Sequence, residues 1–176
     1  VVGHTLTFRG AAELDTAQFR FGTSSLLLDG VDGTTVSTDD HPSFTLGASD
    51  FTVECWIQHN VAPTTQQMYV SKYNNVGSQH EWWLGTNVTA TELYFAYSTT
   101  GADSIVGPSG PWNPVIGQWY HIAATRRGDL MQVYVDGESI GTYDATGVTI
   151  YDGTAKVCIG GREADSTYKL VPNGWI

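Results

Sequence analysis

The feature that most constrains the fold is a succession of short strand-like runs that continues from one end of the chain to the other. Each run is rich in β-branched, aromatic or aliphatic residues and is bounded by Gly, Asn, Asp or Pro. The runs cover residues 5–8, 24–28, 34–37, 51–59, 68–73, 82–85, 93–98, 119–125, 131–135 and 157–159. No long segment has the apolar stripe of a helix, and residues 11–20 are expected to form a loop or one irregular turn. The chain is therefore predicted to be all-β.

Alternation of apolar and polar residues is clearest in two segments. Residues 131–140 alternate up to Asp136-Gly137, a dipeptide that tolerates the positive φ of a type I′ turn, so a hairpin is predicted there. In residues 51–57 the odd positions share one face and the even positions share the other. The predicted core, between two sheets, contains Phe51, Val53, Ile57, Ile122, Ala124, Val133 and Val135.

Size and composition narrow the class of protein. A chain of 176 residues and 19.1 kDa can be built around one core, so one domain over residues 1–176 is expected. The formal net charge of -10 would repel phosphate backbones, and nucleic acid is therefore an unfavourable partner. No apolar run approaches the ~20 residues that cross a bilayer, so membrane insertion is not expected.

The two cysteines, Cys55 and Cys158, each lie inside an apolar strand-like run. Cysteines in such places usually behave as small buried hydrophobes, which favours two free thiols. A disulfide would require their strands to be neighbours in space, so that alternative stays open at this point.

Three blocks of sequence together resemble one family of β-sandwiches. They are residues 21–30 (FGTSSLLLDG), residues 51–57 (FTVECWI) and residues 117–137, which begin GQWYHIAA and end VYVDG; Ile159-Gly160-Gly161 and Gly174-Trp175-Ile176 follow in the same order. The set is similar to the laminin-G-like and pentraxin-like modules of the concanavalin A-like group. The resemblance implies a two-sheet antiparallel jelly-roll sandwich.

The same resemblance suggests that the chain is a segment of a longer polypeptide. Members of the family usually continue after "GWI" into an acidic strand and have one more strand before the position of residues 4–8. Both terminal strands are expected to be missing here, which would leave sheet edges exposed.

Catalytic patterns are weak. Glycoside hydrolases of similar jelly-roll fold have a strand with the pattern E-D-x-x-E, whose paired carboxylates act as nucleophile and acid. Glu54 instead stands alone between Thr52 and Trp56, and the histidines lack the spacing of a zinc site. A non-catalytic protein is expected, with a glycoside hydrolase as the weaker alternative.

Aromatic residues on strands are the better indication of function, because sugar rings stack on aromatic faces while polar neighbours bind the hydroxyls. Extrapolated alternation places five side chains on outward positions, and these are the predicted ligand-binding residues: Trp56, Trp82, Tyr94, His121 and Tyr134. The alternative is that they are packing residues.

Calcium is a possible cofactor, because many members of the resembling families hold this ion. The predicted ligands are Asp29, the Gly30 carbonyl and Asp32, which lie on one tight loop. Calcium requires 6–8 oxygens, so these groups could supply only part of its shell. The alternative is that the two Asp-Gly pairs only form turns.

The resemblance implies a binding or adhesion module, with carbohydrate as the expected ligand, of the kind found in phage structural proteins and secreted bacterial proteins. The expected location is extracellular or on a virion surface, and the expected partners are a glycan or other chains of an assembly. A purely structural role in a larger particle is the rival interpretation.

Overall fold

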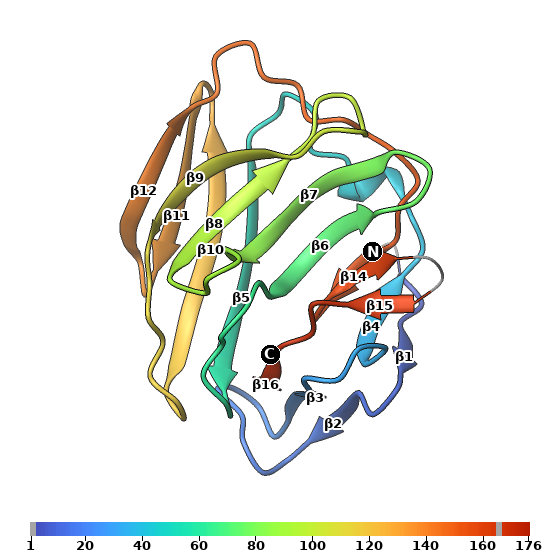
Figure 1. The fold of residues 1–176 in the computed structure, drawn as a ribbon, viewed down its shortest axis with the longest axis vertical. Coiled ribbons are helices and arrows are strands. Elements are labelled where there is room, and N and C mark those ends of the chain that lie inside the picture. The colour runs from blue at the N-terminus through green and yellow to red at the C-terminus, as the bar shows by residue number, and fades with distance from the viewer. Residues whose placement is uncertain (1–2, 165–166) are drawn as a thin grey trace.

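The computed structural model describes residues 3–164 and 167–176, and nearly all of its regular structure is β-strand (Figure 1). The strands form two sheets that pack face to face, which confirms the predicted two-sheet antiparallel sandwich of the jelly-roll type. The single helical element among the described residues is a 3-10 turn, η1 (Pro42–Phe44). No helix in this part of the chain is long and apolar enough to cross a membrane.

The larger sheet, here called sheet A, has the strand order β1-β4-β13-β6-β7-β8-β9, with β14 beside β6 and β15 beside β14. Its strands are β1 (Thr7–Arg9), β4 (Thr35–Thr38), β6 (Met68–Asn74), β7 (Gln79–Thr86), β8 (Glu92–Tyr97), β9 (Ile105–Pro111), β13 (Val157–Ile159), β14 (Arg162–Ala164) and β15 (Thr167–Lys169).

The second sheet, sheet B, has the order β12-β11-β10-β5-β16-β3-β2. Its strands are β2 (Glu13–Asp15), β3 (Ser25–Asp29), β5 (Phe51–His59), β10 (Trp119–Arg127), β11 (Leu130–Val135), β12 (Glu138–Asp144) and β16 (Asn173–Trp175). A loop was predicted over residues 11–20, but part of this segment forms the short strand β2, which pairs with β3. Its sequence carries no sign of a strand because Leu14 is exposed and β2 buries no apolar face.

The main core lies between the two sheets, as the alternation predicted. Ile57, Ile122, Ala124 and Val133 are fully buried, Val53 is buried with them, and Phe51 and Val135 pack against this cluster. The alternate residues of β5 and β10, most of which are polar or aromatic, lie on the outer face of sheet B, and most of them are at least partly exposed.

The predicted hairpin connects β11 to β12. Val135 pairs with Glu138, and the two residues between them, Asp136 and Gly137, have φ of 50° and 83°. Positive φ at both positions is the signature of a type I′ turn. The prediction from the Asp-Gly dipeptide is confirmed.

Two glycines allow the edges of the sheets to meet. A Cβ on Gly110 of β9 would lie 2.0 Å from the Ile140 carbonyl oxygen, and a Cβ on Gly141 of β12 would lie 1.9 Å from the Ser109 carbonyl oxygen. Only glycine permits so close an approach of two backbones. The glycines and prolines of β9 also hide this strand from sequence patterns, and it was not predicted.

The middle of sheet B contains an incomplete pairing. Strand β10 pairs with β5 along most of its length, whereas β16 pairs only with Gln58 and His59 on the other side. Among the described residues, the β5 backbone from Phe51 to Ile57 has no strand partner on that side.

Both cysteines are free, as expected, and burial raises the pKa of each thiol to about 12.

Candidate functional site

Three of the five predicted ligand-binding residues meet on the outer face of sheet B. Trp56 on β5 pairs directly with His121 on β10, and their rings lie 5.3 Å apart. Tyr134 on β11 occupies the next row of the same face, opposite Ala123. All three side chains are partly exposed.

The pairing of β5, β10 and β11 orders this face into rows that run across the strands. One row contains Trp56 and His121, the next Glu54, Ala123 and Tyr134, and the next Thr52, Thr125 and Gln132. Successive rows are separated by two residues, or roughly 7 Å along the strands. Aromatic and polar side chains therefore alternate in a fixed geometry on a rigid support.

Trp56 is the centre of a small aromatic cluster. The Phe21 ring packs edge-on at 5.4 Å, and the Arg20 guanidinium lies 4.5 Å from the indole centroid. The Glu54 carboxylate lies 3.3 Å from Nε2 of His121. A hollow of about 260 Å³ adjoins this cluster and is lined by Phe21, Trp56 and Trp119 among others.

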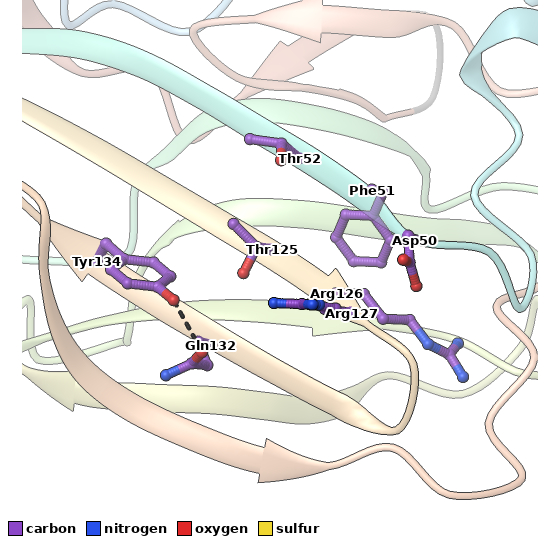
Figure 2. A pocket seen from close by; sticks show the side chains of 8 residues that line it. All are labelled: Asp50, Phe51, Thr52, Thr125, Arg126, Arg127, Gln132 and Tyr134. Carbon is purple, nitrogen blue, oxygen red and sulfur yellow. Dashed lines mark hydrogen bonds between the residues drawn. The ribbon is translucent and has the colours of Figure 1, made fainter.

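A larger hollow of about 500 Å³ lies farther along the same face, towards the β10–β11 turn (Figure 2). It is lined by Asp50, Phe51, Thr52, Thr125, Arg126, Arg127, Gln132 and Tyr134. Its volume is within the range of small-ligand sites, roughly 300–1,000 Å³. Ala123 and Thr125, the outward residues of β10 here, are small, and the larger Tyr134 and Gln132 stand beside them.

Hydrogen bonds hold several side chains of this hollow in place. The Tyr134 hydroxyl donates to Oε1 of Gln132 at 2.8 Å, and Nε2 of Gln132 donates to the Ser139 hydroxyl at 2.9 Å. The Asp50 carboxylate accepts the Gly128 backbone N–H at 2.7 Å. Such fixed polar groups can bind the hydroxyls of a ligand with little loss of side-chain entropy.

Sequence reasoning did not single out Asp50, Thr52, Thr125, Arg127 or Gln132. Thr52, Thr125 and Gln132 are outward residues of strands whose alternation was recognised, so the pattern contained the signal. The row that joins them depends on the register between strands, which the sequence does not display.

The prediction for Trp82 is wrong. Its side chain is only 4% exposed and lies in the main core, stacked on Phe95 at 6.5 Å. The prediction extrapolated the alternation around Trp56 to a strand whose register was assumed, whereas β7 belongs to the other sheet and directs Trp82 into the core. It is the neighbouring Trp83 that joins the cluster on the outer face.

The prediction for Tyr94 is wrong for another reason. Tyr94 does lie on the outer side of sheet A, but it is 6% exposed and packs with Trp83 at a ring distance of 4.4 Å. Leu170 packs against this cluster, and Nε2 of Gln66 donates to the Tyr94 hydroxyl at 2.7 Å. Burial raises the pKa of Tyr94 to about 12. Tyr94 is a packing residue.

The loop predicted to bind calcium has the hydrogen bonds of a turn. Oδ1 of Asp29 accepts the Val31 N–H at 2.9 Å, and the Asp29 carbonyl accepts Nδ2 of Asn173 at 2.8 Å. Gly30 and Gly33 have positive φ. No group of three or more His, Cys, Asp or Glu side chains in the described ranges could hold a metal ion, so Asp29 and Asp32 supply only part of a calcium shell.

Two buried polar clusters serve the interior. Nζ of Lys72, fully buried, contacts the Glu81 carboxylate and lies 2.9 Å from Oδ1 of Asp40, and burial raises the pKa of Glu81. Nε2 of His59 lies 3.0 Å from the Tyr69 hydroxyl, and burial lowers the pKa of His59 to about 4. Buried pairs of this kind stabilise one arrangement of the core, and neither adjoins the hollows on sheet B.

Comparison with known proteins gives a consistent result. A laminin G model of the concanavalin A-like lectin/glucanases superfamily matches residues 29–170. No curated protein matches the chain in sequence.

Several solved structures share the fold. The binding domain of Paraclostridial Mosquitocidal Protein 1 superposes with a TM-score of 0.70 at 11% identity over 98% of this chain, which spans 41% of that structure. Domain 4 of AbnA, a GH43 extracellular arabinanase from Geobacillus stearothermophilus in complex with arabinotriose, has a TM-score of 0.60 at 14% identity, covering 98% of this chain and 83% of that one.

The CBM40 of a Ruminococcus gnavus IT-sialidase bound to α2,3 sialyllactose also has a TM-score of 0.60, at 15% identity, covering 85% of this chain and 86% of that one. Identities this low establish the fold alone.

Proposed function

The chain belongs to the concanavalin A-like lectin/glucanases superfamily, and we propose that it is a non-catalytic carbohydrate-binding module whose site is the outer face of sheet B. The observation that carries this proposal is the alignment of Trp56, His121 and Tyr134 in adjacent rows, with Trp56 beside the hollow of about 260 Å³ and Tyr134 beside the hollow of about 500 Å³. The rows provide ring faces for stacking and polar groups for hydroxyls on one rigid surface.

The similar structures support a binding role. The domain of AbnA was solved with arabinotriose and the CBM40 with sialyllactose, and the mosquitocidal protein domain is described as a binding domain. A short glycan laid along β10 would meet Trp56 or Tyr134 with its ring faces. Gln132, Thr125 and Thr52 would then reach its hydroxyls.

The test is a glycan array followed by isothermal titration calorimetry with Trp56→Ala and Tyr134→Ala. Each substitution is expected to weaken binding about tenfold, because an aromatic stacking contact contributes about 0.5–1.5 kcal/mol beyond the area that it buries. Phe8→Ala is the matched control, since Phe8 is also an exposed aromatic but lies on sheet A. Binding that survives both substitutions would refute this site.

A structural role in an assembly is the second candidate, and one observation favours it. The β5 backbone from Phe51 to Ile57 is open on one side among the described residues, and strands with free N–H and C=O groups accept further strands. A strand from another chain would pair there. Light scattering with size-exclusion chromatography of the chain at increasing concentration tests this role, which predicts association that grows with concentration.

We further propose an extracellular or virion-surface location, on the basis of the superfamily and the acidic composition. The presence of the chain in secreted fractions or purified particles of its host would support this location.

A further inference from the structure

Arg126 is a buried cation without an anionic partner. Its side chain is 5% exposed, and its guanidinium donates to the carbonyl oxygens of Gly128, Val148, Ala145 and Gly47 at 2.9, 2.8, 3.3 and 3.4 Å. No carboxylate forms an ion pair with it among the described residues. Carbonyl dipoles solvate a guanidinium but leave its net charge uncompensated, and buried charges are usually paired.

Arg126 and Arg127 both border the 500 Å³ hollow of sheet B. Only Arg127 extends outward from β10, because Arg126 shares the inward side with its pairing partners Phe51 and Met131. Arg127 is exposed and forms no hydrogen bond or ion pair with any other described residue, so its fork of donors is available to a ligand. The one carboxylate in the hollow, that of Asp50, accepts the N–H of Gly128.

The local balance of charge is thus opposite to that of the whole molecule. Two of the chain's 8 Lys and Arg residues line this hollow with one acid, whereas the chain as a whole has a net charge of -10. A concave site in which positive groups outnumber carboxylates raises the local concentration of anionic ligands. The field in this hollow therefore favours an anion.

We infer that this hollow selects glycans that carry an anionic substituent, a carboxylate above all, and this inference rests on the glycan-binding role proposed above. Figure 2 shows Tyr134 and Arg127 at opposite ends of the hollow with Thr125 between them. A ring stacked on Tyr134 would direct its hydroxyls to Gln132 and Thr125. A carboxylate farther along the chain of sugars would receive the bidentate donors of Arg127 and lie in the field of Arg126.

The experiment measures binding of matched acidic and neutral ligands to the intact chain. Oligogalacturonate is compared with its methyl ester, sialyllactose with lactose, and a sulfated glycan with its unsulfated form. The carboxylated ligand of a pair is expected to bind about tenfold tighter, because hydrogen bonds to a charged group are stronger than those between neutral groups. The preference should shrink at high salt.

Arg127→Gln should remove most of this preference, measured as the ratio of the affinities for the acidic and the neutral ligand of each pair. Arg127→Lys should retain part of it, since charge remains but the bidentate fork is lost. Arg9→Gln makes the same change of charge on β1 of sheet A and should have no effect.

Three results would count against the inference. Equal binding of acidic and neutral partners overturns the selectivity and leaves the glycan site in place. A preference that Arg127→Gln does not alter overturns the assignment to this hollow. If neither acidic nor neutral glycans bind on an array, both this inference and the glycan-binding role fail.

Discussion

The outer faces of the two sheets carry similar aromatic residues in opposite circumstances. On sheet A, Trp83 and Tyr94 are buried beneath other parts of the chain, with Leu170 packed against them. On sheet B, Trp56 and Tyr134 remain partly exposed beside hollows. An aromatic on an outward strand position therefore indicates a binding face only where no further segment covers the sheet.

The largest expected effect tests the interior on which both faces depend. Val133→Asp should destabilise the fold by about 5 kcal/mol or more, comparable with the whole stability of a domain, because a carboxylate would be buried without a partner. Expression and thermal melting provide the measurement. Val106→Asp is the control, since Val106 is 54% exposed and should tolerate the change. A soluble Val133→Asp protein with an unchanged Tm would contradict the assigned register.

The contrast between the faces can be measured with two tryptophans. Trp83→Ala should cost about 3–5 kcal/mol of stability, as for other large buried aromatics, and should leave glycan affinity unchanged. Trp56→Ala should cost only about 1–2 kcal/mol, because its ring is partly exposed, but should weaken binding. Chemical denaturation and calorimetry on both variants decide the matter. The comparison would break if the two costs were equal or if the binding effects were reversed.

A titration in the interior offers the next effect. The pKa of His59 is lowered to about 4 by burial, below the value of about 6.5 in the unfolded chain. The unfolded state therefore binds the proton first, so this contribution to stability is complete above pH 6.5 and is lost as the pH falls towards 4. The loss amounts to about 3 kcal/mol at 1.36 kcal/mol per pH unit.

The variant His59→Gln separates the contribution of His59 to stability from that of carboxylate protonation, because the carboxylates are the same in the variant and in the unsubstituted protein. Urea denaturation between pH 7.5 and 4 should show a steeper loss for the histidine protein than for the glutamine variant. Parallel curves for the two proteins would show that the imidazole is not held neutral by the fold.

The sequence allowed the sheet B face to be predicted better than the sheet A face, for a physical reason. Strands β5 and β10 pair without a register shift from Phe51 to Gln58, so local alternation correctly placed Trp56 and His121 on one side. In sheet A the register shifts between Met68 and Val70 and again between Lys72 and Tyr73. Trp82 was misplaced because its face was extrapolated from β5 to a strand of the other sheet, and no local pattern fixes the register between them.

Sequence patterns also do not show which segments cover a sheet face or which residues pair across strands. The segment through Leu170 reaches Met68 by a backbone hydrogen bond across about a hundred residues of chain, and no local pattern announces that contact. The hollow beside Tyr134 likewise depends on which residues face one another on β5, β10 and β11. The family resemblance supplied the architecture, whereas the site required the register.

The smallest expected effect concerns calcium at the end of β3 in sheet B, where Asp29 is the last residue of the strand. Calcium bound only to the native state would raise stability by about 2.7 kcal/mol at a hundredfold excess over its Kd. We expect the variant Asp29→Asn to abolish that increase while keeping the turn, because the amide oxygen can still accept the Val31 N–H that Oδ1 of Asp29 accepts at 2.9 Å. Thermal melts in calcium, in magnesium and in chelator distinguish a specific ion from a general effect of charge. Identical melts in calcium and chelator would remove the ion from this loop and leave Asp29 as a turn-forming residue, for which Asp29→Ala should cost about 1 kcal/mol.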